Sequence, residues 1–359
     1  MKANKGEWAE FYAFLKILEN KNLFAADKNL EIIPGKFFVF KKIIREEKDK
    51  KTKIFDLTKS EICILDEKWN LLKKIESKGL SSKTLSIFKK IKWAKTTTFE
   101  IPEAENLMHK LLCNQVKANS SKKSDIDGII YDRISNKEEL LGFSVKSMVG
   151  GASTLLNAGK TTNFRYEIKN LDITFIDAIN YIKGRSKIQN RLKAILENWW
   201  VLEFDKVLKP EFENNLRKID TVFPIFLSQM LIEFFLGKWS KINDLLDLLE
   251  ENEILKKTYK LSKSDYEFKM KNFLVSVALG MVPSKEWDGF TKAHWGYIVV
   301  KNNGEVICYH LYNRDEFLTY LYENTKFESP SSTRHEYGKI YQKDNKWYFN
   351  LNLQIRFLK

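Results

Sequence analysis

The chain has 359 residues, enough for one large domain or two ordinary ones. Hydrophobic residues make up 43% and include 25 Phe, 14 Tyr and 9 Trp, which can fill a large core and exclude an intrinsically disordered protein. Lys and Arg number 61 against 47 Asp and Glu, so the formal net charge of +14 favours a polyanionic partner, either nucleic acid or an anionic membrane surface.

The sequence gives no sign of secretion, a disulfide framework or a membrane span. Cys63, Cys113 and Cys308 are far apart and include no C-x-x-C pair, so we expect buried thiols in a reducing compartment. The start, MKANKGEWAE, lacks an apolar signal core. The most hydrophobic window, 221–237, is too short and too polar to span a membrane and predicts a buried helix. We expect a soluble cytoplasmic protein.

In chain order, the first elements are a helix and two strands. Residues 6–20 have apolar side chains at helical spacing and predict a helix with one apolar stripe. Strands are predicted at 35–45 and 53–65, separated by the charged turn EEKDKKT. Proline and acidic residues open a predicted helix at 102. The helical stretches predicted after the strands are 67–77, 81–94 and 102–118.

A hairpin and a long helical region follow. The elements predicted in this part are a polar loop at 118–124, strands at 125–133, 140–147 and 164–171, and a loop with a helical turn at 148–163. Residues 172–280 predict helices throughout, including 187–208. The last hundred residues return to strands, with a hairpin at 296–312 that turns at Asn303-Gly304 and a strand at 346–358. The chain is predicted to be α+β.

The stretch AGKTT at 158–162 resembles the end of a phosphate-binding P-loop. That motif needs a glycine five residues before Gly159, and Thr154 stands there. We therefore expect no nucleotide site.

The predicted hairpin at 125–147 carries acids at the head of one strand and a lysine at the end of the next. Because side chains alternate along a strand, Ser144 and Lys146 share a face, as do Asp125 and Asp127. Carboxylates beside an ammonium suit metal-dependent phosphodiester cleavage, since acids hold Mg²⁺ and the metal activates water. Ordinary surface hairpins show the same spacing, so this pattern alone does not establish an active site.

The spacing resembles the PD-(D/E)XK nuclease core, in which a strand acid precedes an acid-x-lysine triplet. The chain departs from that pattern, because Ser144 stands where the acid of the triplet belongs and cannot supply a negative ligand. Some restriction enzymes of this superfamily share Ser-Val-Lys and take the acid from a neighbouring element. Glu10, in a helix start that resembles their first motif, and Glu167 are the candidates, with Glu7 third. Alternatively, Glu10 only solvates the flank of an apolar helix.

Longer stretches resemble HpaII-type type II restriction endonucleases. They are KGEWAEFYAFLKIL near the start, SDIDGIIYDR…LLGFSVKSMVGGASTLLNAGKTTNFRYEI in the middle, and KNNGEVICYHLYNRDEFLTYLYENTKFESPSSTRHEYGKIY…LNLQIRF near the end. The resemblance implies that Asp125 is the best match for the strand acid and Asp127 the second best, and both are candidate metal ligands. Lys146 is implied to be the catalytic lysine, with Ser144 in the same catalytic group. The resemblance also implies Mg²⁺ as cofactor, CCGG as the site cut after the first C, blocking by cytosine methylation, and a cognate methyltransferase. A palindrome implies a homodimer on double-stranded DNA.

The resemblance further implies two segments that contact DNA. The loop after the active strand, GGASTLLNAGKTTNF, offers hydroxyls and amides that suit phosphates or base edges. The segment ESPSSTRHEYGK contains Arg334, which suits either guanine or a phosphate. The candidates are Ser147, Ser153, Thr154, Asn157, Lys160, Thr162, Asn163, Ser331, Ser332, Thr333, Arg334 and His335. The alternative for both segments is an ordinary polar surface.

The implied fold is a PD-(D/E)XK-type mixed β-sheet core flanked by helices, with a helical insertion and a C-terminal strand-rich part. The expected division is a catalytic core at 1–171 with a basic insertion at about 30–100, a helical region at 172–280, and a strand-rich DNA-recognition part at 281–359, or one continuous unit. Two other functions stay open: a structure-selective or repair nuclease on the same core, and a basic DNA-binding protein without catalysis.

Overall fold

The structure is a computed structural model that describes residues 1–118, 124–132, 136–249, 255–256, 259–290, 295–310 and 314–358. Its contacts divide the chain into two compact units, each made of segments far apart in the sequence. Unit 1 holds Met1–Ser153 and Thr291–Tyr320, and unit 2 holds Thr154–Phe290 and Leu321–Leu358. The functional division predicted at 171 and 280 follows sequence order and stays a prediction.

Unit 1 is built on a mixed sheet in which six strands close into a ring. The ring runs β2-β14-β13-β9-β8-β3, and β3 pairs back to β2. The β13–β9 and β14–β2 pairs are parallel, and the other neighbours in the ring are antiparallel. The ring strands are β2 (Asn22–Ala26), β3 (Ile32–Glu46), β8 (Ile126–Asp132), β9 (Lys137–Ser147), β13 (Trp295–Val300) and β14 (Val306–His310).

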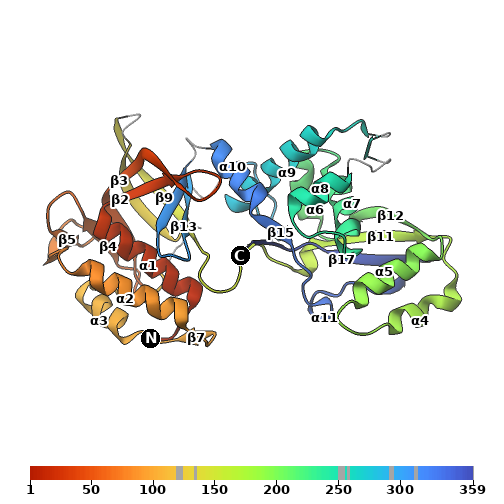
Figure 1. Cartoon of the computed structure of the whole chain (residues 1–359), viewed down its shortest axis with the longest axis horizontal. Helices are drawn as coiled ribbons and strands as arrows, with labels where there is room; N and C mark the ends of the chain where they lie inside the picture. Colours follow the sequence, from red (N-terminus) through yellow and green to blue (C-terminus); the bar gives the residue numbers. More distant parts are fainter. Residues whose placement is uncertain are drawn as a thin grey trace. The chain divides into compact units, whose positions relative to one another are not determined.

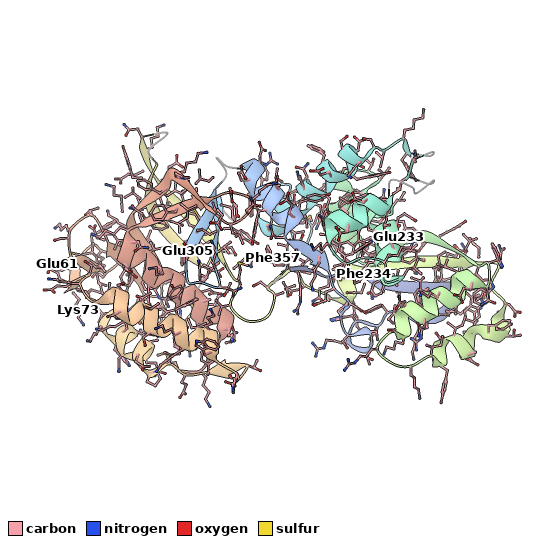
Figure 2. The ribbon with its side chains drawn as sticks, in the orientation of Figure 1. Glu61, Lys73, Glu233, Phe234, Glu305 and Phe357 are labelled. Carbon is pink, nitrogen blue, oxygen red and sulfur yellow. The ribbon has the colours of Figure 1, made fainter. Side chains whose placement is uncertain are left out.

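Three antiparallel strands extend the sheet from β3 to an outer edge. They are β4 (Thr52–Asp56), β5 (Ile62–Leu65) and β6 (Leu71–Ile75). Figure 2 labels Glu61 and Lys73 at this edge, where charged side chains flank the outermost pair of strands. Lysines on an edge strand discourage pairing with a further chain, so β6 ends the sheet.

Helix α1 (Lys5–Asn20) lies against this sheet. It starts where Asn4 and Glu7 form a capping box, and it ends at Lys21 in a left-handed conformation. Its apolar stripe, which includes Phe11 and Phe14, joins the buried core with the inner side chains of the sheet. Helix α2 (Leu80–Trp93) packs alongside α1 (Figure 1). Unit 1 also contains α3 (Pro102–Lys110) and most of α10 (Arg314–Glu323). The short strands β1 (Ala3–Asn4) and β7 (Thr98–Phe99) pair with each other.

Unit 2 has an antiparallel sheet in the order β12-β11-β17-β16 and a smaller one in the order β10-β18-β15. The strands are β10 (Thr154–Leu156), β11 (Asn163–Lys169), β12 (Val201–Val207), β15 (Thr325–Phe327), β16 (Ile340–Lys343), β17 (Lys346–Asn352) and β18 (Ile355–Phe357). The helices are η1 (Lys160–Thr162), η2 (Ile173–Phe175), α4 (Ile176–Tyr181), α5 (Lys187–Glu197), α6 (Pro210–Ile219), α7 (Phe223–Phe235), α8 (Ile242–Leu249), α9 (Lys263–Ala278) and α11 (Ser332–His335).

The larger sheet of unit 2 has one apolar face and one polar face. Tyr166 on β11 is fully buried and its hydroxyl donates to the backbone oxygen of Ser228 in α7, so α7 covers the apolar face. Arg165, the residue before Tyr166, has its side chain on the other face of the sheet. It pairs with Asp205 at 2.6 Å and lies over the ring of Tyr348. Strand alternation thus separates a core face from a face of hydrogen-bonding groups.

The α+β class, helices α1 and α2, and the β13–β14 hairpin around Asn303-Gly304 are confirmed. The helix predicted at 102–118 ends at Lys110, and the strand predicted at 53–65 is two strands, β4 and β5. No helix in the described part of the chain is long and apolar enough to cross a membrane, and α7 occupies the hydrophobic window as a buried helix. The three cysteines are buried free thiols, as predicted.

Three predictions of secondary structure were wrong. Residues 67–77 contain strand β6 instead of a helix, and the predicted helix 187–208 ends at Glu197 and is followed by strand β12. Mixed Leu, Lys and Ile sequences are locally compatible with both a helix and a strand. Residues in β6 and β12 form strands because they pair with β5 and β11. In the predicted strand-rich ending, residues 314–323 form helix α10.

Gly296 of β13 lies where neighbouring groups leave no room for a side chain. An added Cβ would lie 2.6 Å from the backbone oxygen of Tyr309 and 2.8 Å from the ring of Phe143. We expect Gly296→Ala to lower the free energy of unfolding by about 1–3 kcal/mol, as overpacking does. Gly151→Ala, which meets nothing within 4 Å, is the control. Urea denaturation measures both, and equal stabilities would contradict this packing.

Candidate active site

Three segments of unit 1 bring acidic and basic groups to the open end of the β8–β9 hairpin. Asp125 stands just before β8, and its backbone N–H donates to the backbone oxygen of Phe143 at 2.8 Å, which continues the pairing of the two strands. Ser144 and Lys146 follow on β9, and Glu10 comes from α1. The hairpin register and the start of α1 thus determine which groups meet here.

The carboxylate of Asp125 is held by two donors of β9 and by a lysine. Its Oδ2 accepts from the backbone N–H of Val145 at 2.9 Å and from the hydroxyl of Ser144 at 3.2 Å. Its Oδ1 lies 3.2 Å from Nζ of Lys117. Ser144 therefore orients a carboxylate and does not replace one.

Glu10 reaches the same lysine from the opposite side. Its Oε1 lies 3.3 Å from Nζ of Lys117, while its Oε2 is buried and has no hydrogen-bond partner among the described residues. Burial and the neighbouring Asp125 raise the pKa of Glu10 to about 7, although Lys117 and Lys146 oppose that rise. A buried carboxylate oxygen without a partner is a ligand position available to a cation.

The charges of both acids, Asp125 and Glu10, affect the pKa of Lys146. Burial lowers the pKa of its ammonium, and the carboxylates of Asp125 and Glu10 counter part of this effect. Its Nζ is 5.5 Å from the ring centre of Tyr297 on β13, the strand that pairs in parallel with β9. The lysine is thus buried near an aromatic ring and interacts electrostatically with two carboxylates.

Sequence reasoning missed Lys117. It follows α3 in a segment predicted to be helical, and no motif or spacing marks it. Its side chain is 44% exposed, and although burial lowers its pKa, Asp125 and Glu10 raise it above the ordinary value. Only the fold places this lysine between two acids that are distant in sequence.

The other predicted acids do not join this cluster. Asp127 accepts a hydrogen bond from Ser124 at 2.6 Å, and Glu7 caps the start of α1. Glu167 lies on β11 in unit 2, where it pairs with Lys169 and Lys346. Of the candidates for the acid missing at Ser144, the one that shares a partner with Asp125 is Glu10.

The donors at this cluster fit Mg²⁺. Glu10 and Asp125 offer hard carboxylate oxygens, one of them buried without a partner, and they already share one cation, Lys117. Within the described residues no three His, Cys, Asp or Glu side chains gather as a metal site. Mg²⁺ commonly takes one or two carboxylates and keeps several waters, so two acids are sufficient.

Several predicted DNA-binding residues hold the loops together. Ser147 accepts from the backbone of Val149, and Ser153 donates to the backbone oxygen of Ser147. Thr162 is fully buried and donates to the backbone oxygen of Gly159. Buried Asn163 donates to the backbone oxygen of His335, so it connects the two segments predicted to contact DNA.

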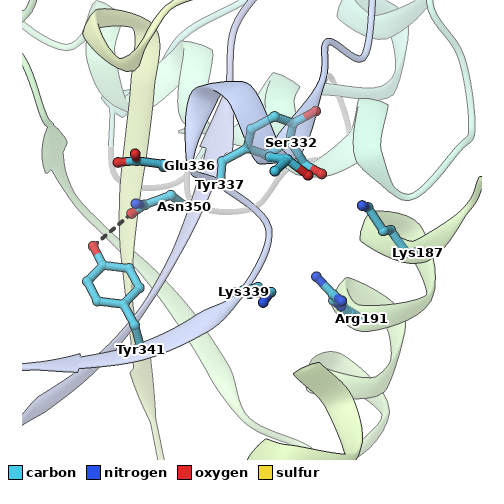
Figure 3. A pocket seen from close by; sticks show the side chains of 9 residues that line it. Lys187, Arg191, Ser332, Glu336, Tyr337, Lys339, Tyr341 and Asn350 are labelled. Atoms are coloured by element: carbon cyan, nitrogen blue, oxygen red, sulfur yellow. Dashed lines mark hydrogen bonds between the residues drawn. The ribbon is translucent and has the colours of Figure 1, made fainter. Parts of the chain in front are cut away.

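The remaining candidates have accessible positions. Asn157 and Arg334 are exposed, Thr154 opens β10, and Lys160 pairs with Glu336. Ser331 caps α11 by accepting from the backbone N–H of Arg334. Burial and the adjacent Arg334 lower the pKa of His335. Ser332 and Thr333 line a cavity in unit 2 that also contains basic side chains (Figure 3).

The raised pKa of Glu10 makes a prediction about stability. Because this pKa is about 7 in the folded protein and near 4.5 when unperturbed, ionisation of Glu10 destabilises the fold progressively between about pH 4.5 and pH 7. Glu10→Gln should therefore raise the free energy of unfolding by about 1–3 kcal/mol at about pH 8 in EDTA, with a smaller gain at about pH 5. Denaturation at the two pH values tests this, and equal gains would refute it.

Comparison with known proteins identifies the family. Residues 4–357 match the model of the HpaII restriction endonuclease family. The chain is 38% identical over 359 residues to the type II restriction enzyme HpaII of Haemophilus parainfluenzae, covering 99% of this chain and 98% of that protein. No solved structure matches the chain. The chain belongs to the HpaII restriction endonuclease family of type II restriction enzymes.

Proposed function

We propose that this type II restriction enzyme cuts double-stranded DNA at CCGG after the first C, with Mg²⁺ as cofactor, and that cytosine methylation blocks it. The observation that carries the proposed chemistry is the shared contact of Glu10 and Asp125 with one lysine, next to Lys146. The proposed recognition site derives from the family resemblance. Membership of this family favours site-specific cleavage over a structure-selective nuclease or a DNA-binding protein without catalysis.

Asp125 and Glu10 are the proposed metal ligands. When bound, Mg²⁺ would activate the attacking water and offset the charge that develops on the phosphate. The hydroxyl of Ser144 and the backbone of Val145 hold Oδ2 of Asp125, so its Oδ1, which lies next to Lys117, is the oxygen that would bind the cation. Glu10 supplies the carboxylate that Ser144 does not.

Lys146 is the proposed catalytic lysine. Burial lowers its pKa, which makes loss and gain of a proton at Nζ easier than for an exposed lysine. From this position its Nζ can orient the attacking water or neutralise the scissile phosphate. Lys117 has a different proposed role: its one positive charge offsets part of the negative charge of the two acids before a metal ion binds.

A palindromic site also implies two symmetric active sites, so we propose that two copies of the chain act together on DNA. The cognate DNA methyltransferase is a functional partner in the same restriction–modification system.

Digestion of a plasmid tests the proposed activity. With Mg²⁺ we expect discrete fragments whose sequenced ends place each cut after the first C of CCGG, and no fragments in EDTA or from a plasmid methylated at these cytosines. Cuts at another sequence would refute the recognition site, and nicks that follow DNA structure would refute site-specific cleavage.

Lys146→Ala tests the mechanism. It should lower the rate of cleavage about 10²–10⁴-fold, because a positioned proton-transfer group contributes that much. DNA affinity, measured by fluorescence anisotropy in EDTA, should change little. Lys137→Ala is the control, since Lys137 is an exposed lysine on the same strand. Cleavage by the Lys146 variant at the rate of the control would refute the assigned role.

A further inference from the structure

Unit 2 contains a cavity of about 320 Å³ that gathers three basic side chains. Lys187 and Arg191 come from the first turns of α5, and Lys339 precedes β16. In Figure 3 these three side chains lie around one space, opposite Ser332 and Tyr337. The residues that line the cavity all belong to unit 2, so it takes no part in the cluster around Asp125, which lies in unit 1.

Arg191 carries a positive charge that no carboxylate compensates within the described residues. It is only 4% exposed, and its guanidinium donates to the backbone oxygens of Gly338, Asn180 and Ile182 at 2.6 to 2.7 Å. Its Nε is buried without a hydrogen-bond partner among these residues. Burial lowers the pKa of Arg191. Carbonyl oxygens orient the guanidinium, but they do not cancel its charge, so an anion would stabilise it.

The two lysines add to this charge. Neither Lys187 nor Lys339 forms an ion pair with a described residue, while Glu336, the acidic residue of the lining, already pairs with Lys160. Helix α5 begins at Lys187 with no side-chain cap and no acidic residue in its first turn, so its positive end is also uncompensated. Ser332 and Thr333 contribute hydroxyl groups to the wall of the cavity.

We propose that this cavity binds a backbone phosphate of the DNA. Lys187 and Lys339 contact the phosphate oxygens, the hydroxyls of Ser332 and Thr333 donate to them, and Arg191 adds fixed positive charge. A phosphate fits better than a base edge, because base edges combine donors and acceptors whereas this group of three cations matches an acceptor with a negative charge. The inference rests on the proposed function and adds to it the site at which unit 2 holds its substrate.

Binding measurements test the inference independently of cleavage. We expect Lys187→Ala with Lys339→Ala to weaken binding to duplexes with and without CCGG by a similar factor, about tenfold, because phosphate contacts carry no sequence information. The slope of log affinity against log salt should fall by about 2, one for each lost lysine. Fluorescence anisotropy in EDTA at several salt concentrations measures both quantities.

The control is Lys193→Ala with Lys206→Ala, which removes the same charge at exposed positions of α5 and β12 outside the cavity. An equal loss in the two double variants would attribute the effect to overall charge and overturn the site. Unchanged affinity and slope in the Lys187 and Lys339 variant would also overturn it. Cleavage of plasmid by the wild type is scored separately, so a failure of this site is distinguishable from a failure of the proposed function.

Acetylation of lysines on the wild-type protein, read by mass spectrometry, tests the site without a substitution. Duplex DNA should protect Lys187 and Lys339 more than Lys193. Absence of this difference would overturn the inference. A parallel sample with inorganic phosphate separates the two sources of the same chemistry: protection by phosphate ion but not by DNA would identify a site for a free anion and refute a backbone contact.

Discussion

The candidate site depends on the placement of one ammonium group between two carboxylates. Glu10 and Asp125 are both largely removed from water, and burial, followed by repulsion from the charge of Asp125, raises the pKa of Glu10 to about 7. Lys117 lies about equally far from both acids, at 3.3 and 3.2 Å, and counteracts this repulsion. The protein thus accepts an electrostatic cost at the location where we propose that Mg²⁺ binds.

The rest of unit 1 keeps this arrangement in place. The capping box at Asn4 and Glu7 sets where α1 begins, and therefore which side of the helix presents Glu10. Strand β9 pairs with β8 on one side and β13 on the other, so that Lys146 is held in the same sheet as Asp125 and Tyr297. The ring of Tyr297 beside Lys146 comes from β13, a segment about 150 residues further along the chain, so pairing of β9 with β13 brings distant parts of the sequence together here.

Local patterns predicted the elements that local interactions determine. The stripe of α1, the strands β8 and β9, and the Asn303-Gly304 turn are each encoded within a few residues, and the structure confirms them. Strands β6 and β12 were mistaken for helices because their state depends on hydrogen bonds to partners that composition does not reveal. The same limitation hid Lys117, whose role as a shared partner of two acids exists only after the chain has folded.

The cluster around Asp125 has no excess of basic groups with which to attract DNA, because its two lysines are matched by two carboxylates. Most of the attraction to the phosphates of DNA therefore has to come from basic groups outside this cluster. The net charge of +14 provides this in general terms. A rigid cavity such as the one around Lys187, Arg191 and Lys339 provides more, because an oriented, buried charge fixes the position of a phosphate, whereas exposed lysines only raise its local concentration. Under this proposal the groups that hold DNA are separate from the groups that cut it, and each set can keep the charge its task requires.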